Sequence, residues 1–176
     1  MRKKTSGTGL MLGRGVITVL FVACVLFIWR NSMESAAASS ARSGRVTELV
    51  NQVLSDLGGE NVTEHFIRKL AHFSEYGMEG VLTVLLFMIY YLKPGERVCA
   101  MLVTGMFTAV VDESIQFFSA GRSPGIGDIC IDMAGFICGM LFMWLAGKAM
   151  KTWLQNRNGK RRSANLSLHK FFQLAD

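Results

Sequence analysis

The sequence predicts an all-α, polytopic membrane protein: a four-transmembrane-helix bundle with a short amphipathic extracytoplasmic helix. Of the 176 residues, 51% are hydrophobic and the mean hydropathy is +0.32, which indicates lipid rather than water as the main solvent. The basic residues give a net charge of +6 and gather at the ends of the apolar segments, as on the cytoplasmic flanks of membrane helices. No recognition motif accompanies them, so a nucleic-acid partner is not expected.

The first apolar segment runs from about residue 16 to residue 29. It reaches the ~20 residues of a spanning helix when residues 10–15 are added. The basic residues that precede this segment and the small residues at 35–41 also fit a secretory signal peptide with a cleavage site. We favour a retained helix because the small residues begin several positions beyond the apolar core.

The polar segment of residues 30–64 fits an extracytoplasmic loop. Within it, apolar residues recur at helical spacing, which predicts a short amphipathic helix that lies on the membrane or caps the bundle. Gly58 and Gly59 are expected to end this helix. Its apolar residues are Val46, Leu49, Val50, Val53, Leu54 and Leu57.

Three further apolar segments complete the predicted bundle: residues 66–92, 98–118 and 126–148. Thirteen basic residues would flank the spans on the cytoplasmic side and four on the outer side, so both termini of this cell-membrane protein are expected in the cytoplasm. The expected parts are a basic N-terminus with the first helix, an extracytoplasmic loop, a three-helix core and a basic cytoplasmic tail (residues 1–30, 31–64, 65–148 and 149–176).

Ionisable residues form stripes on the last three predicted spans. Arg68, His72, Glu75 and Glu79 are four, three and four residues apart, so at ~100° per residue they fall within an arc of about 60°. The other stripes are Gly105, Thr108, Asp112 and Gln116, with Glu113 beside them, and Asp128, Asp132, Gly135 and Gly139. The topology places these charges in the extracytoplasmic half. The GxxxG spacing in the last stripe predicts close helix packing.

This charged cluster is the candidate functional site, because burying a charge in a bilayer costs at least ~2.5 kcal/mol. Six carboxylates face three obligate cations (Arg68, Lys69 and Arg122) and His72, so pairing alone leaves negative charge uncompensated. Protonation of carboxyl groups, a bound cation or a water-filled vestibule would each account for the excess negative charge. The alternative is a salt-bridge network that only fixes helix register. The candidate ligand-binding residues are Arg68, His72, Glu75, Glu79, Asp112, Glu113, Gln116, Arg122, Asp128 and Asp132.

The four cysteines have neither the close pairing of a zinc site nor the spacing of a disulfide framework. We interpret them as small core residues. No cofactor is expected, although a divalent cation is compatible with the excess of acids. The cysteines are Cys24, Cys99, Cys130 and Cys138.

Three ordered blocks resemble the VanZ-like membrane proteins, whose patterns read approximately RKxAHxxEY, DExxQ, and PGRxxxxxD followed by NxxG. The matching residues, between about 65 and 140, are Arg68-Lys69-Leu70-Ala71-His72-Phe73-Ser74-Glu75-Tyr76, Asp112-Glu113-Ser114-Ile115-Gln116, and Gly121-Arg122 with Asp128 and Gly135. Ala120 replaces the usual proline, and Asp132 stands where asparagine is common, which adds an acid. The family takes its name from a teicoplanin resistance protein of Gram-positive bacteria, so the resemblance implies a cell-envelope location and a link to the glycopeptide antibiotic response.

Three classes of function remain open. The leading hypothesis is a binding module whose outward-facing acidic vestibule engages a cationic, amphiphilic or lipid-linked ligand, such as a lipoglycopeptide or a cell-wall precursor. The runner-up is an enzyme, a hydrolase or transferase, in which His72 acts as a base or holds a metal while Arg68 and Arg122 hold a phosphate. A transporter is third, because the inner halves of the spans carry no continuous charged pathway.

Overall fold

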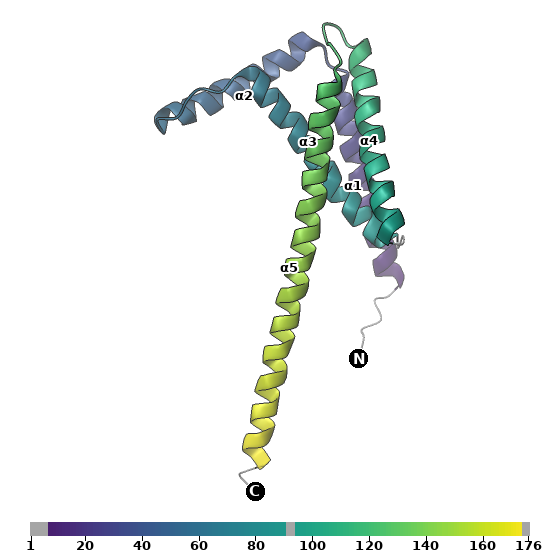
Figure 1. Cartoon of the computed structure of the whole chain (residues 1–176), viewed down its shortest axis with the longest axis vertical. Helices are drawn as coiled ribbons and strands as arrows, with labels where there is room; N and C mark the ends of the chain where they lie inside the picture. The colour runs from purple at the N-terminus through teal and green to yellow at the C-terminus, as the bar shows by residue number, and fades with distance from the viewer. Residues whose placement is uncertain (1–6, 91–93, 174–176) are drawn as a thin grey trace. The chain divides into compact units, whose positions relative to one another are not determined.

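The computed structural model describes residues 7–90 and 94–173, with side chains for residues 9–90 and 95–158. Every regular element in these ranges is an α-helix (Figure 1). The helices are α1 (Gly7–Ser32), α2 (Ala36–Asp56), α3 (Glu64–Ile89), α4 (Pro94–Phe118) and α5 (Ile126–Gln173). The all-α class is therefore confirmed.

The helix boundaries follow local sequence signals. The Ser35 hydroxyl caps α2 by accepting a hydrogen bond from the Ala38 amide at 3.3 Å, and the Thr63 hydroxyl caps α3 by accepting one from Phe66 at 3.2 Å. Beyond α2, Gly58 has a φ of 73°, which a glycine adopts without strain. The predicted stop after α2 is thus confirmed.

Three helices are long and apolar enough to cross a membrane: Gly9–Ser32, Gly95–Phe118 and Ile126–Asn158, among the residues described. They match the first, third and fourth predicted spans and fit a multi-pass membrane protein. Helix α3 is 26 residues long but is not among the three, because ionisable residues in its first half lower its hydropathy. Length and composition alone therefore do not establish the second predicted span, residues 66–92, or the count of four spans.

The chain divides into two compact units, residues 1–140 and 141–176. The second unit continues α5. There, the Lys148 ammonium lies 3.6 Å from the centre of the Trp144 ring, and the Arg157 guanidinium lies 5.2 Å from that of Trp153. These cation–π contacts stabilise basic residues beside aromatic ones, a combination typical of a membrane interface.

Within the first unit, α1, α3 and α4 run side by side, and α2 packs against α3 (Figure 1). The core of this unit contains Ile28, Tyr76, Ala109 and, from α5, Phe136, each no more than 1% exposed. Helix α1 also donates a hydrogen bond from the Trp29 indole to the Thr108 carbonyl at 3.3 Å. Helix α1 thus packs within the bundle.

Helices α3 and α5 approach each other through glycines. A Cβ atom added to Gly139 would meet the Gly77 carbonyl oxygen, and one added to Gly80 would meet that of Phe136. Gly135 is equally confined by the Phe73 carbonyl. The close packing predicted from the GxxxG spacing is confirmed, and its partner is the GxxG pair of α3.

One end of the first unit joins the end of α1, the start of α2 and the loop between α4 and α5. The Ser119 hydroxyl donates to the Ser32 carbonyl at 2.7 Å, and the Ala36 amide donates to the Ala120 carbonyl at 2.9 Å. These bonds satisfy backbone groups that helix ends leave unpaired. This end, which also contains the start of α3, is here called the polar end.

Helix α2 and the cysteines differ from the sequence predictions. Helix α2 covers the predicted short helix but begins earlier, at Ala36, and Val46, Leu49 and Val53 on it are 44%, 64% and 59% exposed. Cys99, Cys130 and Cys138 are exposed in the described structure, so their interpretation as core residues was wrong. Hydrophobicity placed them in spans, but it did not distinguish a core face from an outer face.

We expect Gly139→Ala to lower the thermal stability of the protein in detergent, because the added methyl group would force α3 and α5 apart, at a cost of about 1–3 kcal/mol. Gly147→Ala is the matched control, since a Cβ there meets nothing within 4 Å and alanine favours a helix. Thermal unfolding followed by circular dichroism measures both. Equal midpoints for the two variants would contradict the close contact.

Candidate functional site

The three predicted stripes converge inside the first unit. Glu79 of α3, Asp112 of α4 and Asp132 of α5 are each no more than 1% exposed. The His72 Nδ1 atom lies 3.5 Å from the Asp132 carboxylate, and Gln116 donates a hydrogen bond to Asp112 at 3.2 Å. Ligand atoms of His72, Asp112 and Asp132 all lie within 4.8 Å of one another. Three helices therefore bring an imidazole and two carboxylates together in the bundle interior.

A basic layer, made of Arg68, Lys69 and Arg122, lies between this group and the polar end. Lys69 of α3 forms an ion pair with Asp128 in the first turn of α5. Arg122 connects three elements: its guanidinium donates to the Glu34 carbonyl at 3.3 Å, to the Gln116 side chain at 3.4 Å and to the Asn31 carbonyl at 3.5 Å. Burial and the nearby Arg68 lower the pKa of Arg122 from its ordinary value. Arg68 and Arg122 thus repel each other across this layer.

A polar cavity of about 280 Å³ opens at this layer. Its cationic side chains come from α3 and the α4–α5 loop, and its two acids come from α5. The charged and imidazole residues that line it are His65, Arg68, Lys69, His72, Arg122, Asp128 and Asp132. The lining is therefore mixed, with three obligate cations against two carboxylates, and differs from the acidic vestibule expected from the sequence count.

A second cavity, of about 300 Å³, lies between α1, α2 and α3. Arg68, His72 and Arg122 line it too, so the two cavities share a wall. Its other lining residues include the apolar Phe27, Val46, Ile67 and Ala71. A polar cavity and a more apolar one therefore adjoin at the same basic side chains.

The remaining predicted residues have separate places. Glu75 accepts a hydrogen bond from the Asn31 amide at 2.8 Å and lines the second cavity. Glu113 is 7% exposed and accepts a hydrogen bond from the Gly125 amide, so it holds the α4–α5 loop and lines neither cavity. Gln116 links Asp112 to Arg122. Glu113 thus has a local structural partner.

Sequence reasoning missed the contribution of α1 and α2. Asn31 binds both Glu75 and Arg122, and Arg42 of α2 forms an ion pair with Glu34 at 3.0 Å. These residues precede the periodic part of the polar segment, which begins at Val46, and belong to no motif. Tyr76, 0% exposed, could have been found, because it ends the first motif block.

Several buried polar atoms of the site make no hydrogen bond of normal geometry in the described structure. They include the Nδ1 atom of His72, one carboxylate oxygen of Asp112 and both of Asp132. An unpartnered buried polar atom costs about 1–3 kcal/mol. The interior of the site is therefore able to accept a further partner.

Reversing the charge of either member of the Lys69–Asp128 pair should destabilise the protein, and reversing both should restore most of the loss. Lys69→Asp or Asp128→Lys places like charges in contact, and the double variant restores an ion pair. We expect a coupling energy of about 1 kcal/mol. A double-mutant cycle of thermal unfolding in detergent measures it. Additive losses would show that the two side chains do not meet.

A search of family models matches residues 16–147 to VanZ/LLP1. Neither a curated protein nor a solved structure matches the chain. The match covers α1 from residue 16, all of α2, α3 and α4, and the part of α5 that contributes to the site. It includes the blocks with Arg68, Asp112 and Arg122, on which the resemblance was based. Because the match extends over well more than half of the chain, this protein belongs to the VanZ/LLP1 family.

Proposed function

We propose that this protein binds an amphiphilic or lipid-linked cell-envelope ligand through the phosphate of its head group. The observation that carries the proposal is the polar cavity, where Arg68, Lys69 and Arg122 lie together. Arginine and lysine are the side chains that proteins use to bind phosphate. The excess of obligate cations in this lining favours an anionic head group over the cationic ligand suggested by the acid count.

The electrostatics of this layer support an anion. Lys69 is already paired with Asp128, whereas Arg68 and Arg122 repel each other. A bound phosphate would accept hydrogen bonds from both guanidinium groups and remove the repulsion. Arg122 donates hydrogen bonds to the backbone carbonyls of Asn31 and Glu34. Because a carbonyl group has no net charge, these bonds do not neutralise the guanidinium.

The second cavity supports a ligand with an apolar chain. Phe27, Ile67 and Ala71 line it beside the arginines that would hold the head group. On α2, Val46, Leu49 and Val53 are exposed at helical spacing, and an interfacial helix would place them in the lipid head-group region. The site would then open at a membrane surface, where a lipid-linked cell-wall precursor or a lipoglycopeptide antibiotic is found.

We further propose that α3 also crosses the membrane, which makes four spans in all. Both termini are then cytoplasmic, and the polar end lies at the extracytoplasmic surface of a Gram-positive cell membrane. A helix of 26 residues is roughly 39 Å long, enough to cross a bilayer. The other helices of the first unit shield its ionisable half, and basic residues flank the opposite ends of the spans. A role in the glycopeptide antibiotic response would follow from binding such a ligand at the outer leaflet.

A hydrolase or transferase acting on the same lipid-linked phosphate is the second candidate. The observation in its favour is His72, which lines the polar cavity while its Nδ1 atom lies 3.5 Å from Asp132. A carboxylate beside an imidazole favours its action as a general base. Release of inorganic phosphate from a polyisoprenyl phosphate, lost in His72→Ala, would distinguish this enzyme from a binding protein.

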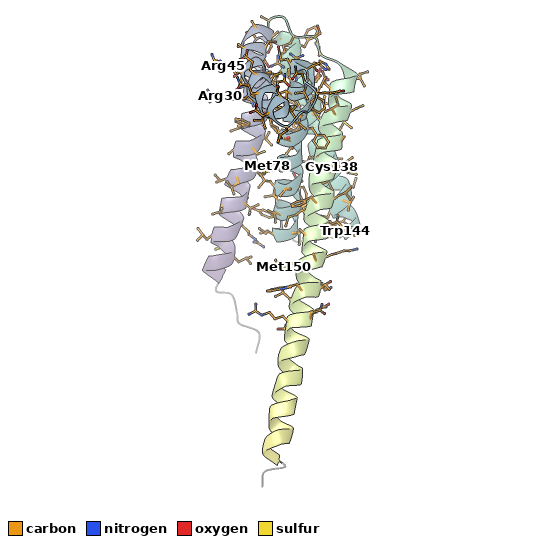
Figure 2. The ribbon with its side chains drawn as sticks, turned by 90° about the vertical axis from the view of Figure 1, so that its left-hand side faces the viewer. Arg30, Arg45, Met78, Cys138, Trp144 and Met150 are labelled. Atoms are coloured by element: carbon orange, nitrogen blue, oxygen red, sulfur yellow. The ribbon has the colours of Figure 1, made fainter. Side chains whose placement is uncertain are left out.

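We expect the purified protein in nanodiscs of neutral lipid to retain polyisoprenyl phosphate, and Arg68→Gln to weaken this binding at least about tenfold, because a charge-assisted hydrogen bond contributes about 1.5–3 kcal/mol. Native mass spectrometry of the bound lipid measures retention. Arg45→Gln is the matched control, since Arg45 is an exposed arginine of α2 at the polar end (Figure 2) and lines neither cavity.

Three outcomes decide the proposal. Retention by the wild type and by Arg45→Gln, with loss in Arg68→Gln, supports it. Equal retention by all three proteins would place the lipid elsewhere. Retention of phosphatidylglycerol as strong as that of the polyisoprenyl phosphate would show that the site binds any lipid phosphate.

A further inference from the structure

We propose that His72, Asp112 and Asp132 bind a divalent cation of the first transition row, such as Mn²⁺ or Zn²⁺. The proposal concerns the interior of the bundle below the basic layer. It does not depend on the proposed lipid-binding function, because the cation would bind whether or not a head group occupies the cavity.

Geometry is the first support. One nitrogen and two carboxylate oxygens, from α3, α5 and α4, lie within 4.8 Å of one another. Ligands at about 2.1 Å from a tetrahedral metal are roughly 3.4 Å apart. The separations between the ligand atoms therefore need to shorten by at most about 1.4 Å, which side-chain rotation and the attraction of a cation supply.

The second support is independent of the clustering. Asp132, with a side chain 1% exposed, has both carboxylate oxygens without a hydrogen bond, and one oxygen of the fully buried Asp112 also has none. The Nδ1 atom of His72 lies 3.5 Å from one Asp132 oxygen but likewise makes no hydrogen bond of normal geometry. Buried polar atoms without hydrogen bonds are costly, and a cation bound between these atoms would satisfy all of them at once.

The composition of the group selects the ion. One imidazole with two carboxylates suits Mn²⁺ or Zn²⁺ better than Ca²⁺ or Mg²⁺, which prefer oxygen ligands alone. Gln116 donates to Asp112 at 3.2 Å and would orient this carboxylate as an outer-shell partner.

The position of the group leaves the cation accessible. His72 and Asp132 line the polar cavity, whereas Asp112 does not, so the cation would lie at the wall of the cavity with three protein ligands. Three protein ligands and an open position are typical of catalytic rather than structural metal sites. A phosphate held by Arg68 and Arg122 would lie on the open side.

Metal binding by the full chain, purified in detergent without added lipid, tests the inference. We expect electron paramagnetic resonance to detect about one tightly bound Mn²⁺ per chain, with electron spin-echo modulation from a coordinating imidazole nitrogen. Asp132→Asn and His72→Ala should each weaken Mn²⁺ binding at least about tenfold, and His72→Ala should remove the nitrogen modulation. Zn²⁺ should displace the bound Mn²⁺.

Glu113→Gln is the matched control, because it removes a buried carboxylate next to Asp112 that holds the α4–α5 loop instead of facing the group. It should bind Mn²⁺ as the wild type does. A wild-type protein that binds neither metal, or binds Mn²⁺ without nitrogen modulation, would overturn the inference even if a variant failed to fold. Equal affinity in Asp132→Asn and Glu113→Gln would overturn it as well.

Discussion

The close contact between α3 and α5 is the constraint on which the arrangement of the site depends. Gly77 and Gly139 allow the two backbones to touch, and Gly80 and Gly135 continue the contact. This packing fixes the register in which Lys69 meets Asp128 and His72 meets Asp132. A larger side chain at any of the confined glycines would separate the two stripes. In a membrane, small residues stabilise such pairs through van der Waals contact rather than hydrophobic burial.

The register separates two layers of charge. Three acids from three helices lie in the interior, and the obligate cations lie nearer the polar end, where hydrogen bonds to α1 and the α4–α5 loop hold Arg122. If every charge of one layer paired with a charge of the other, the result would be a structural network that binds no ligand. Lys69 pairs with Asp128, but carboxylate oxygens of Asp112 and Asp132 make no hydrogen bond. On the account proposed above, the cationic layer would therefore bind an anion and the acidic layer a cation.

Helical periodicity was sufficient to predict the fold class, three of the spans and the stripe that contains His72 and Glu79. These features depend on residues within one helix, whose spacing determines which side chains share a face. The GxxxG spacing predicted a close contact, and Gly77 identifies its partner only in the structure. Helix α3 shows a limit of hydropathy, because its ionisable residues make it less apolar than its neighbours.

The site could be predicted in composition but not in arrangement. Counting acids suggested a negative vestibule, whereas the cavity lining is mixed, with three obligate cations against Asp128 and Asp132, because Glu79 and Asp112 lie deeper. The depth of a side chain depends on the relative axial positions of helices, which no single helix encodes. Asn31 shows the same limit, since its bonds to Glu75 and Arg122 join segments distant in the sequence.

Thiol accessibility in intact cells tests most directly whether the polar end opens to the cell exterior. In a variant without the four native cysteines, Ser123→Cys at the polar cavity should react with a membrane-impermeant maleimide added to whole cells. Gly95→Cys, at the start of α4, should react only after permeabilisation. The reverse pattern would place the charged cavity on the cytoplasmic side and contradict an outward-facing site.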